Sequence, residues 1–342
     1  MMNNYYYGKS GKGDFRRDDM PETRMQLFWD TLRTRLSGLC RLNLIYMLAW
    51  LPAIVVIVLF VSRMYTNLTM VAMVKENDYA AYVQIAADAE REVTITEEEY
   101  NELRNAEVDL PGYLKQDLLK MLAILIPCIA LTGPFTAGMS YVTRNWARDE
   151  HAFIWSDFRD AVKENWKIPL VLSTVTGVLP LLVYLGWVTY GGMAANNMIM
   201  IIPQMLVVLA GIIWSLSITY MHPLTVTYDL KMKDVIRNGL LLGVARLPFS
   251  VGIRLLHCVP ALITVAAVWF FGLDVMLALV LLSGYYMIIG FGLSRFITAS
   301  YTNAVFDRFI NSRIEGAKVN QGLREKEEDE ADEDEAEKET EV

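Results

Sequence analysis

The fold is decided by two neighbouring apolar stretches, IPLVLSTVTGVLPLLVYLGWVTY at Ile168–Tyr190 and MIMIIPQMLVVLAGIIWSLSITYM at Met198–Met221. Neither stretch contains a charged residue, and the connecting GGMAANN of Gly191–Asn197 is also uncharged. A helix needs about 20 apolar residues to cross the roughly 30 Å hydrocarbon core of a bilayer. The pair is therefore predicted to form a transmembrane hairpin.

Four further stretches have the same character, and the sequence predicts an all-α, polytopic membrane protein with six transmembrane helices. Of the 342 residues, 54% are hydrophobic and only 20% are charged, which argues against a compact water-soluble enzyme. The additional spans are Leu42–Ser62, Met121–Val142, Leu255–Phe271 and Val275–Leu293.

Lys and Arg residues gather in alternate segments between the predicted spans. By contrast, the connections at 191–197 and 271–274 contain Asp274 as their one charged residue. Because Lys and Arg in short loops mark the cytoplasmic side, both termini are expected in the cytoplasm, with the bilayer being the plasma membrane. The basic segments are residues 9–41, 144–167, 231–254 and 295–324.

The net charge of -8 combines zones of opposite sign. Residues 325–342 hold twelve acids and two lysines, and residues 63–117 hold twelve acids and five basic residues, so the rest of the chain is positive. The tail is predicted to be disordered, either as a solubilising segment or as an interaction tail for a basic partner. The expected organisation is a flexible cytoplasmic segment (1–24), an amphipathic helix with the first span (25–62), an acidic extracytoplasmic insertion (63–117), the remaining bundle (118–324) and the tail (325–342).

The insertion at 63–117 is expected to be a solvated helical element, with helices within 78–93 and 96–107. Thr96 and Glu99 have the spacing of a capping box, in which each residue satisfies a backbone N–H of the other. The alternative is a cap that binds a ligand or a partner.

Three amphipathic segments precede predicted spans, at Gln26–Arg41, Ser156–Lys167 and Asp229–Val244. Ser156 is a natural N-cap. The span after each segment contains a proline that follows an apolar residue. We therefore expect three tandem units, each an interfacial amphipathic helix followed by a transmembrane hairpin. The amphipathic helices would either lie in the headgroup layer or dock a partner. The three prolines are Pro52, Pro180 and Pro260.

The sequence TGPFTAGMSYVTR at residues 132–144 and the amphipathic segment that follows it resemble the YesL family of bacterial membrane proteins, which is defined by a domain of unknown function. The resembling positions are a Gly-Pro pair, a Tyr and Arg at the end of the helix, and a Phe in the next helix. The resemblance extends over residues 28–52 and 132–306, whereas residues 53–131 depart from the family pattern. The motif positions are Gly133, Pro134, Tyr141, Arg144 and Phe158.

The genes of YesL-like proteins tend to lie beside genes for carbohydrate uptake systems of the ATP-binding-cassette (ABC) type. The resemblance therefore implies a protein that is accessory to such a system or scaffolds it, with the permease or ATPase subunits as partners. The family supplies no catalytic residues. The alternative is a small-solute transporter, but few polar residues lie within the spans to bind a solute. These are Ser173, Thr174, Thr176, Gln204, Ser215 and Ser217.

No nucleotide-binding loop, zinc-protease motif or serine-hydrolase motif is present, so we expect no enzyme activity, cofactor, metal or nucleic-acid partner. Charged residues near membrane spans are costly and often functional, although snorkelling relieves the cost at span ends. The candidate functional residues are accordingly Arg254, Arg295, His222 and Asp229. Arg295 would hold an anionic group or pair with Asp229, unless these arginines only snorkel and the histidines bond to backbone.

Overall fold

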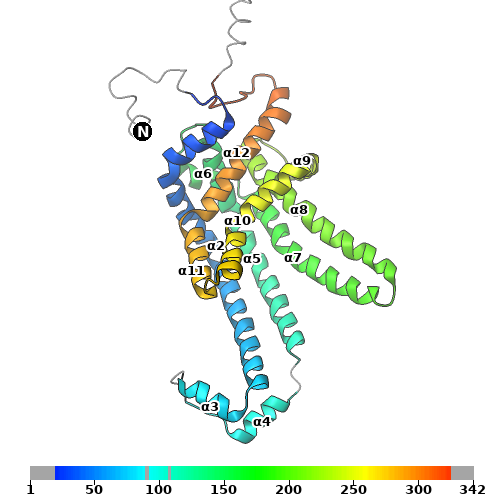
Figure 1. The fold of residues 1–342 in the computed structure, drawn as a ribbon. Helices are drawn as coiled ribbons and strands as arrows, with labels where there is room; N and C mark the ends of the chain where they lie inside the picture. The colour runs from blue at the N-terminus through cyan, green and yellow to red at the C-terminus, as the bar shows by residue number, and fades with distance from the viewer. Residues whose placement is uncertain (1–19, 89–91, 107–108, 325–342) are drawn as a thin grey trace, which may run out of the picture. The chain divides into compact units, whose positions relative to one another are not determined.

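A computed structural model of the protein describes residues 20–88, 92–106 and 109–324. Within these ranges the chain is helical without strands, and six helices are long and apolar enough to cross a bilayer (Figure 1). The predicted all-α, six-span architecture is confirmed, and the chain is a multi-pass membrane protein. The flexibility predicted for residues 1–24 falls largely on residues outside the described ranges, as does the predicted disorder of residues 325–342.

The spanning helices are α2, α5, α7, α8, α10 and the α11–α12 pair, which is joined by a π-helical segment, η3. Prolines 52, 180 and 260 all lie inside helices, as expected for spans packed in a bundle. The bounds are α2 Arg24–Glu76, α3 Tyr79–Asp88, α4 Glu97–Asn105, α5 Leu110–Trp146, α6 Ser156–Glu164, α7 Lys167–Ala194, η2 Met198–Met200, α8 Ile201–Thr227, α9 Met232–Ala245, α10 Leu247–Phe271, α11 Val275–Tyr285, η3 Tyr286–Gly290, α12 Phe291–Phe309 and η4 Asn311–Arg313.

The chain divides into two compact units, each of which is described by itself. Unit 1 comprises the chain up to Ala49, Leu131–Ser173 and the chain from Leu209 onward. Unit 2 comprises Trp50–Ala130 and Thr174–Val208.

In unit 2 the acidic insertion is helical, as predicted. The segment between the two neighbouring spanning helices is, however, shorter than the expected residues 63–117. Helix α2 continues to Glu76 and α5 already begins at Leu110, so only α3 and α4 are distinct helices between them (Figure 1). The capping box of α4 is present: Glu99 N donates to Thr96 Oγ1 at 3.3 Å, and Thr96 N donates to Glu99 Oε2 at 2.8 Å. The hydrogen bonds from the backbone and side chain of Thr96 lower the pKa of the Glu99 carboxyl.

A cluster of three tyrosine rings gives the acidic insertion an apolar centre. Tyr100 of α4 is fully buried, and its ring lies 5.1 Å from the ring of Tyr82 and 5.7 Å from that of Tyr79. Lys75 Nζ donates to the carbonyl oxygens of Arg104 and Ala106 at 2.6 and 2.8 Å, where α4 ends. A cation at the C-terminus of a helix stabilises the last carbonyl groups. The insertion is therefore packed around its own aromatic core, despite its charge.

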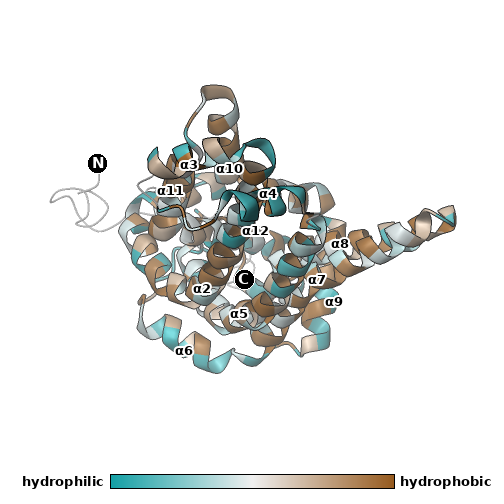
Figure 2. Cartoon of the chain, turned by 90° about the horizontal axis from the view of Figure 1, so that it is seen from below, coloured by the Kyte–Doolittle hydropathy of each residue, from teal (hydrophilic) through white to brown (hydrophobic). Residues whose placement is uncertain are grey.

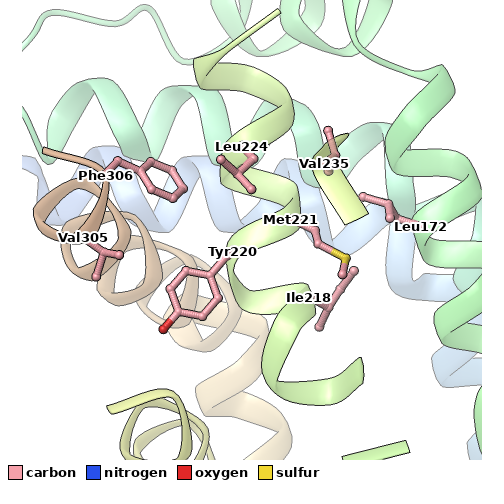
Figure 3. Packing of buried hydrophobic residues seen from close by; sticks show 8 residues of the cluster. All are labelled: Leu172, Ile218, Tyr220, Met221, Leu224, Val235, Val305 and Phe306. Carbon is pink, nitrogen blue, oxygen red and sulfur yellow. The ribbon is translucent and has the colours of Figure 1, made fainter. Parts of the chain in front are cut away.

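The core of unit 1 is formed where α7, α8, α9 and α12 meet (Figure 3). Tyr220, Met221 and Leu224 of α8 are fully buried between Val235 of α9 and Phe306 of α12. Burial of an apolar side chain of this size stabilises a fold by about 1.5–3 kcal/mol. The core also contains Leu172, Ile218 and Val305.

The structure corrects the first of the three expected tandem repeats, which lacks a separate amphipathic helix. Helices α6 and α9 are separate from the spans that follow them, but residues 26–41 are part of α2 and continue into the first span without a break. Pro169 and Pro248 stand at the starts of α7 and α10, where proline favours a new helix, and no such residue separates Arg41 from the first span. Ser156 is the first residue of α6 and not its N-cap. Figure 2 shows the hydrophilic residues along α6.

Candidate functional site

Unit 1 brings together two arginines and two histidines from three helices, which we name the cationic cluster: Arg254 and His257 of α10, Arg295 of α12 and His222 of α8. Arg254 and Arg295 interact electrostatically with each other and with both histidines. The sequence predicted three of these four residues as candidates and left His257 unassigned.

Arg295 is positioned by a chain of hydroxyl groups that begins on α2. Its Nη2 donates to the Tyr46 hydroxyl oxygen at 3.4 Å, and that hydroxyl lies 2.7 Å from Thr136 Oγ1 on α5. Because Thr136 donates its own proton to the Thr132 carbonyl at 2.8 Å, Tyr46 must donate to Thr136. The hydroxyl oxygen of Tyr46 then accepts from Arg295. Hydrogen bonds arranged in series in this way polarise and strengthen one another.

The π-helical segment η3 ends one turn before Arg295, and Asn43 of α2 is bonded to it. Asn43 Nδ2 donates to the carbonyl oxygens of Tyr286 and Met287 at 3.0 and 2.7 Å, and its Oδ1 accepts from Gly292 N at 2.8 Å. A π turn interrupts the regular backbone bonding of a helix. The fully buried Asn43 amide satisfies the groups at this interruption and fixes the start of α12.

Arg254 reaches across from α10 to α8, where its Nη2 donates to the carbonyl oxygen of Ser215. Its Nε is buried and has no hydrogen-bond partner within the described chain. On both sides of it α10 presents exposed apolar residues, including Val251 and Leu255, so the arginine extends inward from an apolar surface.

The two histidines differ in their surroundings. His222 is 4% exposed, and its Nδ1 has no hydrogen-bond partner in the described part of the molecule. It lies two helical turns after Ser215, on the same face of α8. His257 is half-buried, with its Nε2 3.4 Å from Thr298 Oγ1. Thr298 lies one turn after Arg295 on α12.

Asp229 is not part of the cluster. It is exposed in the connection between α8 and α9, and no ion pair joins it to Arg295 among the described residues. The pairing expected from the opposite charges is wrong because Tyr46, from the distant α2, occupies the position beside Arg295.

The motif positions at the end of α5 have structural roles. Arg144 Nη1 donates to the Val226 carbonyl at 2.5 Å, near the end of α8, and its guanidinium lies 5.0 Å from the centre of the Tyr141 ring. Its Nε and Nη2 donate to Asn145 Oδ1 at 3.1 and 2.8 Å. Arg144 therefore joins the ends of α5 and α8.

The glycines of the motif region allow close helix packing. The position that a Cβ would occupy on Gly133, next to Pro134, is filled by the backbone of Pro169 and Leu170 in α7. Gly138 lies directly against Phe158 of α6, so any side chain there would collide with that ring and the backbone of α6. These positions hold α5, α6 and α7 together within unit 1.

Sequence reasoning missed a second polar network, at the opposite ends of α2 and α12. Arg24 Nη2 lies 2.5 Å from Asp307 Oδ2, and Asn311 Nδ2 donates to Asp307 Oδ1 at 2.6 Å. Tyr228, after α8, donates to Asn311 Oδ1 at 2.7 Å. Burial, with a smaller contribution from the Asp307 charge, raises the pKa of Tyr228 to about 12. Arg24 and Tyr228 are far in the sequence from Asp307 and Asn311, which are four residues apart, so no local pattern indicates the whole network.

A profile of the family described as "Protein of unknown function, DUF624" matches residues 64–187, about a third of the chain. The match contains the motif region, and it also takes in most of residues 53–131, which were predicted to depart from the family pattern. It leaves out residues 28–52 and 188–306, to which the resemblance was extended. Comparisons with curated proteins and with solved structures gave no match. The similarity supports an integral membrane protein of unestablished activity.

Proposed function

We propose that this protein is a non-catalytic accessory or scaffold of a carbohydrate ABC-type uptake system in the bacterial plasma membrane, with both termini cytoplasmic. The orientation is supported by the distribution of Lys and Arg between the loops. The choice of partner is supported by the resemblance to YesL-like proteins, and the permease and ATPase subunits are the proposed partners.

The observation that carries the docking proposal is the mixed charge of the outer face of α6. Phe158 and Ala161 are buried, whereas exposed residues of both signs follow one another along the other face. A helix that only lies in an anionic headgroup layer is rich in Lys and Arg on its polar face. The exposed face of helix α6 instead carries acids and bases in equal number, which favours a protein surface. The charged residues of the helix are Asp157, Arg159, Asp160, Lys163 and Glu164.

Exposed aromatic residues adjoin this charged face. Phe153 and Trp155, just before α6, are 65% and 61% exposed. Aromatic anchors next to charged residues are typical of protein–protein contact sites. We propose that Phe153 and Trp155 are the apolar part of the contact and that the charges of α6 set its specificity.

Two of the polar residues of the spans lie against neighbouring helices, which supports the accessory role over transport. Gln204 Nε2 donates to the Trp187 carbonyl at 3.2 Å within the α7–α8 hairpin of unit 2. Ser217 is fully buried in unit 1, where its side chain closely approaches Gly243 of α9. A sugar carrier needs many polar groups for its substrate, whereas these already pack between helices.

Affinity purification from native membranes tests the proposal. The wild-type protein is expected to recover permease or ATPase subunits, and a Phe153→Ala/Trp155→Ala variant is expected to lose them. Trp269→Ala is the matched control, because Trp269 is an aromatic residue of α10 that is 82% exposed and distant in sequence from α6. Equal recovery of these subunits by the wild type and the double variant would contradict the docking proposal. Solute flux by the purified protein alone in liposomes would instead support the transporter alternative.

A further inference from the structure

We propose that the cationic cluster of unit 1 binds a phosphate group. The inference is independent of any docking at α6, since it concerns the interior of the helix bundle and a different chemistry. The ligand is either the phosphodiester of an anionic lipid headgroup or free phosphate.

The first support is the number of donors that the protein leaves unused. A guanidinium has five N–H donors in a planar fork. The described contacts of Arg295 consist of one long bond to Tyr46, and those of Arg254 consist of one bond to the Ser215 carbonyl, while Arg254 Nε remains buried and unpaired. Buried polar groups without partners cost free energy, so a cluster of them indicates an absent acceptor.

The second support is the buried His222. Its Nδ1 is buried without a hydrogen-bond partner, and the side chain interacts electrostatically with both Arg254 and Arg295. A neutral imidazole nitrogen that carries its proton can donate to an anion. Arg254 of α10 bonds to the Ser215 carbonyl, two turns before His222 on the same face of α8, so the unsatisfied groups of the two helices face the same part of unit 1.

The third support is uncompensated charge. Two arginines of like sign repel each other, and they do so more strongly in a medium of low dielectric constant than in water. Within the described ranges no carboxylate forms an ion pair with either of them. An anion between Arg254 and Arg295 would offset this repulsion and accept hydrogen bonds from both guanidinium groups.

The arrangement favours phosphate over a carboxylate. The donors belong to three different helices, α8, α10 and α12, so they are not confined to the plane of one guanidinium group. A phosphate group offers acceptor oxygens in several directions, whereas a carboxylate offers two oxygens in one plane, and guanidinium forks match phosphate well. Because Arg254 extends inward from an apolar stretch of α10, a ligand can approach it from the bilayer. Basic pockets between transmembrane helices bind lipid headgroups in this way.

The test uses the full-length protein, delipidated in a neutral detergent. Thermal unfolding is measured while phosphatidylglycerol or phosphatidylcholine is added in mixed micelles, and in parallel while inorganic phosphate replaces chloride at constant ionic strength. The apparent affinity follows from the rise in unfolding temperature with ligand concentration. The wild type is expected to be stabilised by phosphatidylglycerol more than by phosphatidylcholine if the source is lipid, and by inorganic phosphate if free phosphate suffices.

Arg254→Gln and Arg295→Gln are each expected to weaken this binding about tenfold or more, because each removes charge-assisted hydrogen bonds. Arg237→Gln is the control, since Arg237 is exposed on α9 and should leave the affinity unchanged. If a glutamine variant does not fold, the lysine variants Arg254→Lys and Arg295→Lys replace it. They retain the charge but lose the fork, and affinity is expected to fall several-fold.

Two results would overturn the proposal. One is a wild-type protein that neither phosphatidylglycerol nor phosphate stabilises beyond the phosphatidylcholine and chloride controls. The other is binding by the arginine variants with the same affinity as the wild type and Arg237→Gln. Neither result affects the recovery of partner subunits, so the failure of this inference and the failure of the docking proposal are distinguishable.

Discussion

Replacing Asn43 by Ala is expected to destabilise unit 1 far more than the loss of one small side chain in a helix would suggest. The Asn43 amide makes three hydrogen bonds to the backbone around η3, with lengths of 3.0, 2.7 and 2.8 Å. Alanine fits the α2 helix well but leaves two carbonyl groups and one N–H group without these partners. Side-chain hydrogen bonds between transmembrane helices contribute about 0.6 kcal/mol on average and up to about 1.7 kcal/mol. The loss is therefore about 2–5 kcal/mol.

The assay is thermal unfolding of the purified protein, followed by tryptophan fluorescence. A loss of this size should lower the unfolding temperature by about 4 °C or more. Asn101→Ala is the matched control, because Asn101 is an exposed residue of α4 in unit 2. Asn43→Asp adds a further comparison: it keeps an acceptor for Gly292 N but loses the amide donors and buries a charge, so it should be at least as destabilising. The reasoning is refuted if Asn43→Ala unfolds at the same temperature as Asn101→Ala.

Three further predictions follow from the packing and the pKa shifts. Gly138→Leu should destabilise unit 1 by at least about 1–3 kcal/mol, because the new side chain collides with α6, whereas Gly252→Leu meets open space and should leave thermal unfolding nearly unchanged. Helix α4 should become more susceptible to proteolysis as the pH falls below the ordinary glutamate pKa of 4.5. The reason is that the lowered pKa of Glu99 stabilises the folded state only while the carboxylate is ionised. The variant Thr96→Ala should weaken this pH dependence. Stability should fall as the pH rises above about 10, where unfolded tyrosine ionises while folded Tyr228 stays protonated up to about 12, and the fall should be smaller in Tyr228→Phe.

The six spans and the capping box were predictable because both depend on local sequence. Hydropathy alone identifies a membrane helix, and a capping box needs only Thr96 and Glu99 at the right spacing. The start of α2 was less predictable: an amphipathic segment before a span is compatible both with a separate interfacial helix and with one continuous helix. No proline or glycine marks a boundary directly after Arg41, and that absence favours the continuous helix.

The candidate site was only partly predictable, because its contacts connect distant parts of the chain. Arg254, Arg295 and His222 were identified from the cost of placing polar groups near a membrane span. The partner of Arg295 was not, since Tyr46 lies 249 positions away and the opposite charge of Asp229 favours a pairing with that residue. Asn43 is an amide within the apolar stretch of residues 42–62, but nothing in the sequence indicates that it bonds to η3.

The π-helical segment η3 has a consequence for the alignment of related sequences. A π turn closes over one more residue than an α turn, so α12 is rotated by roughly 100° relative to a regular continuation of α11. Deleting one residue within Tyr286–Gly290 would restore a regular helix and turn Arg295 away from its partners. In an alignment, a single-residue gap at this position would therefore indicate that a different face of α12 packs inward, and not a neutral variation in length.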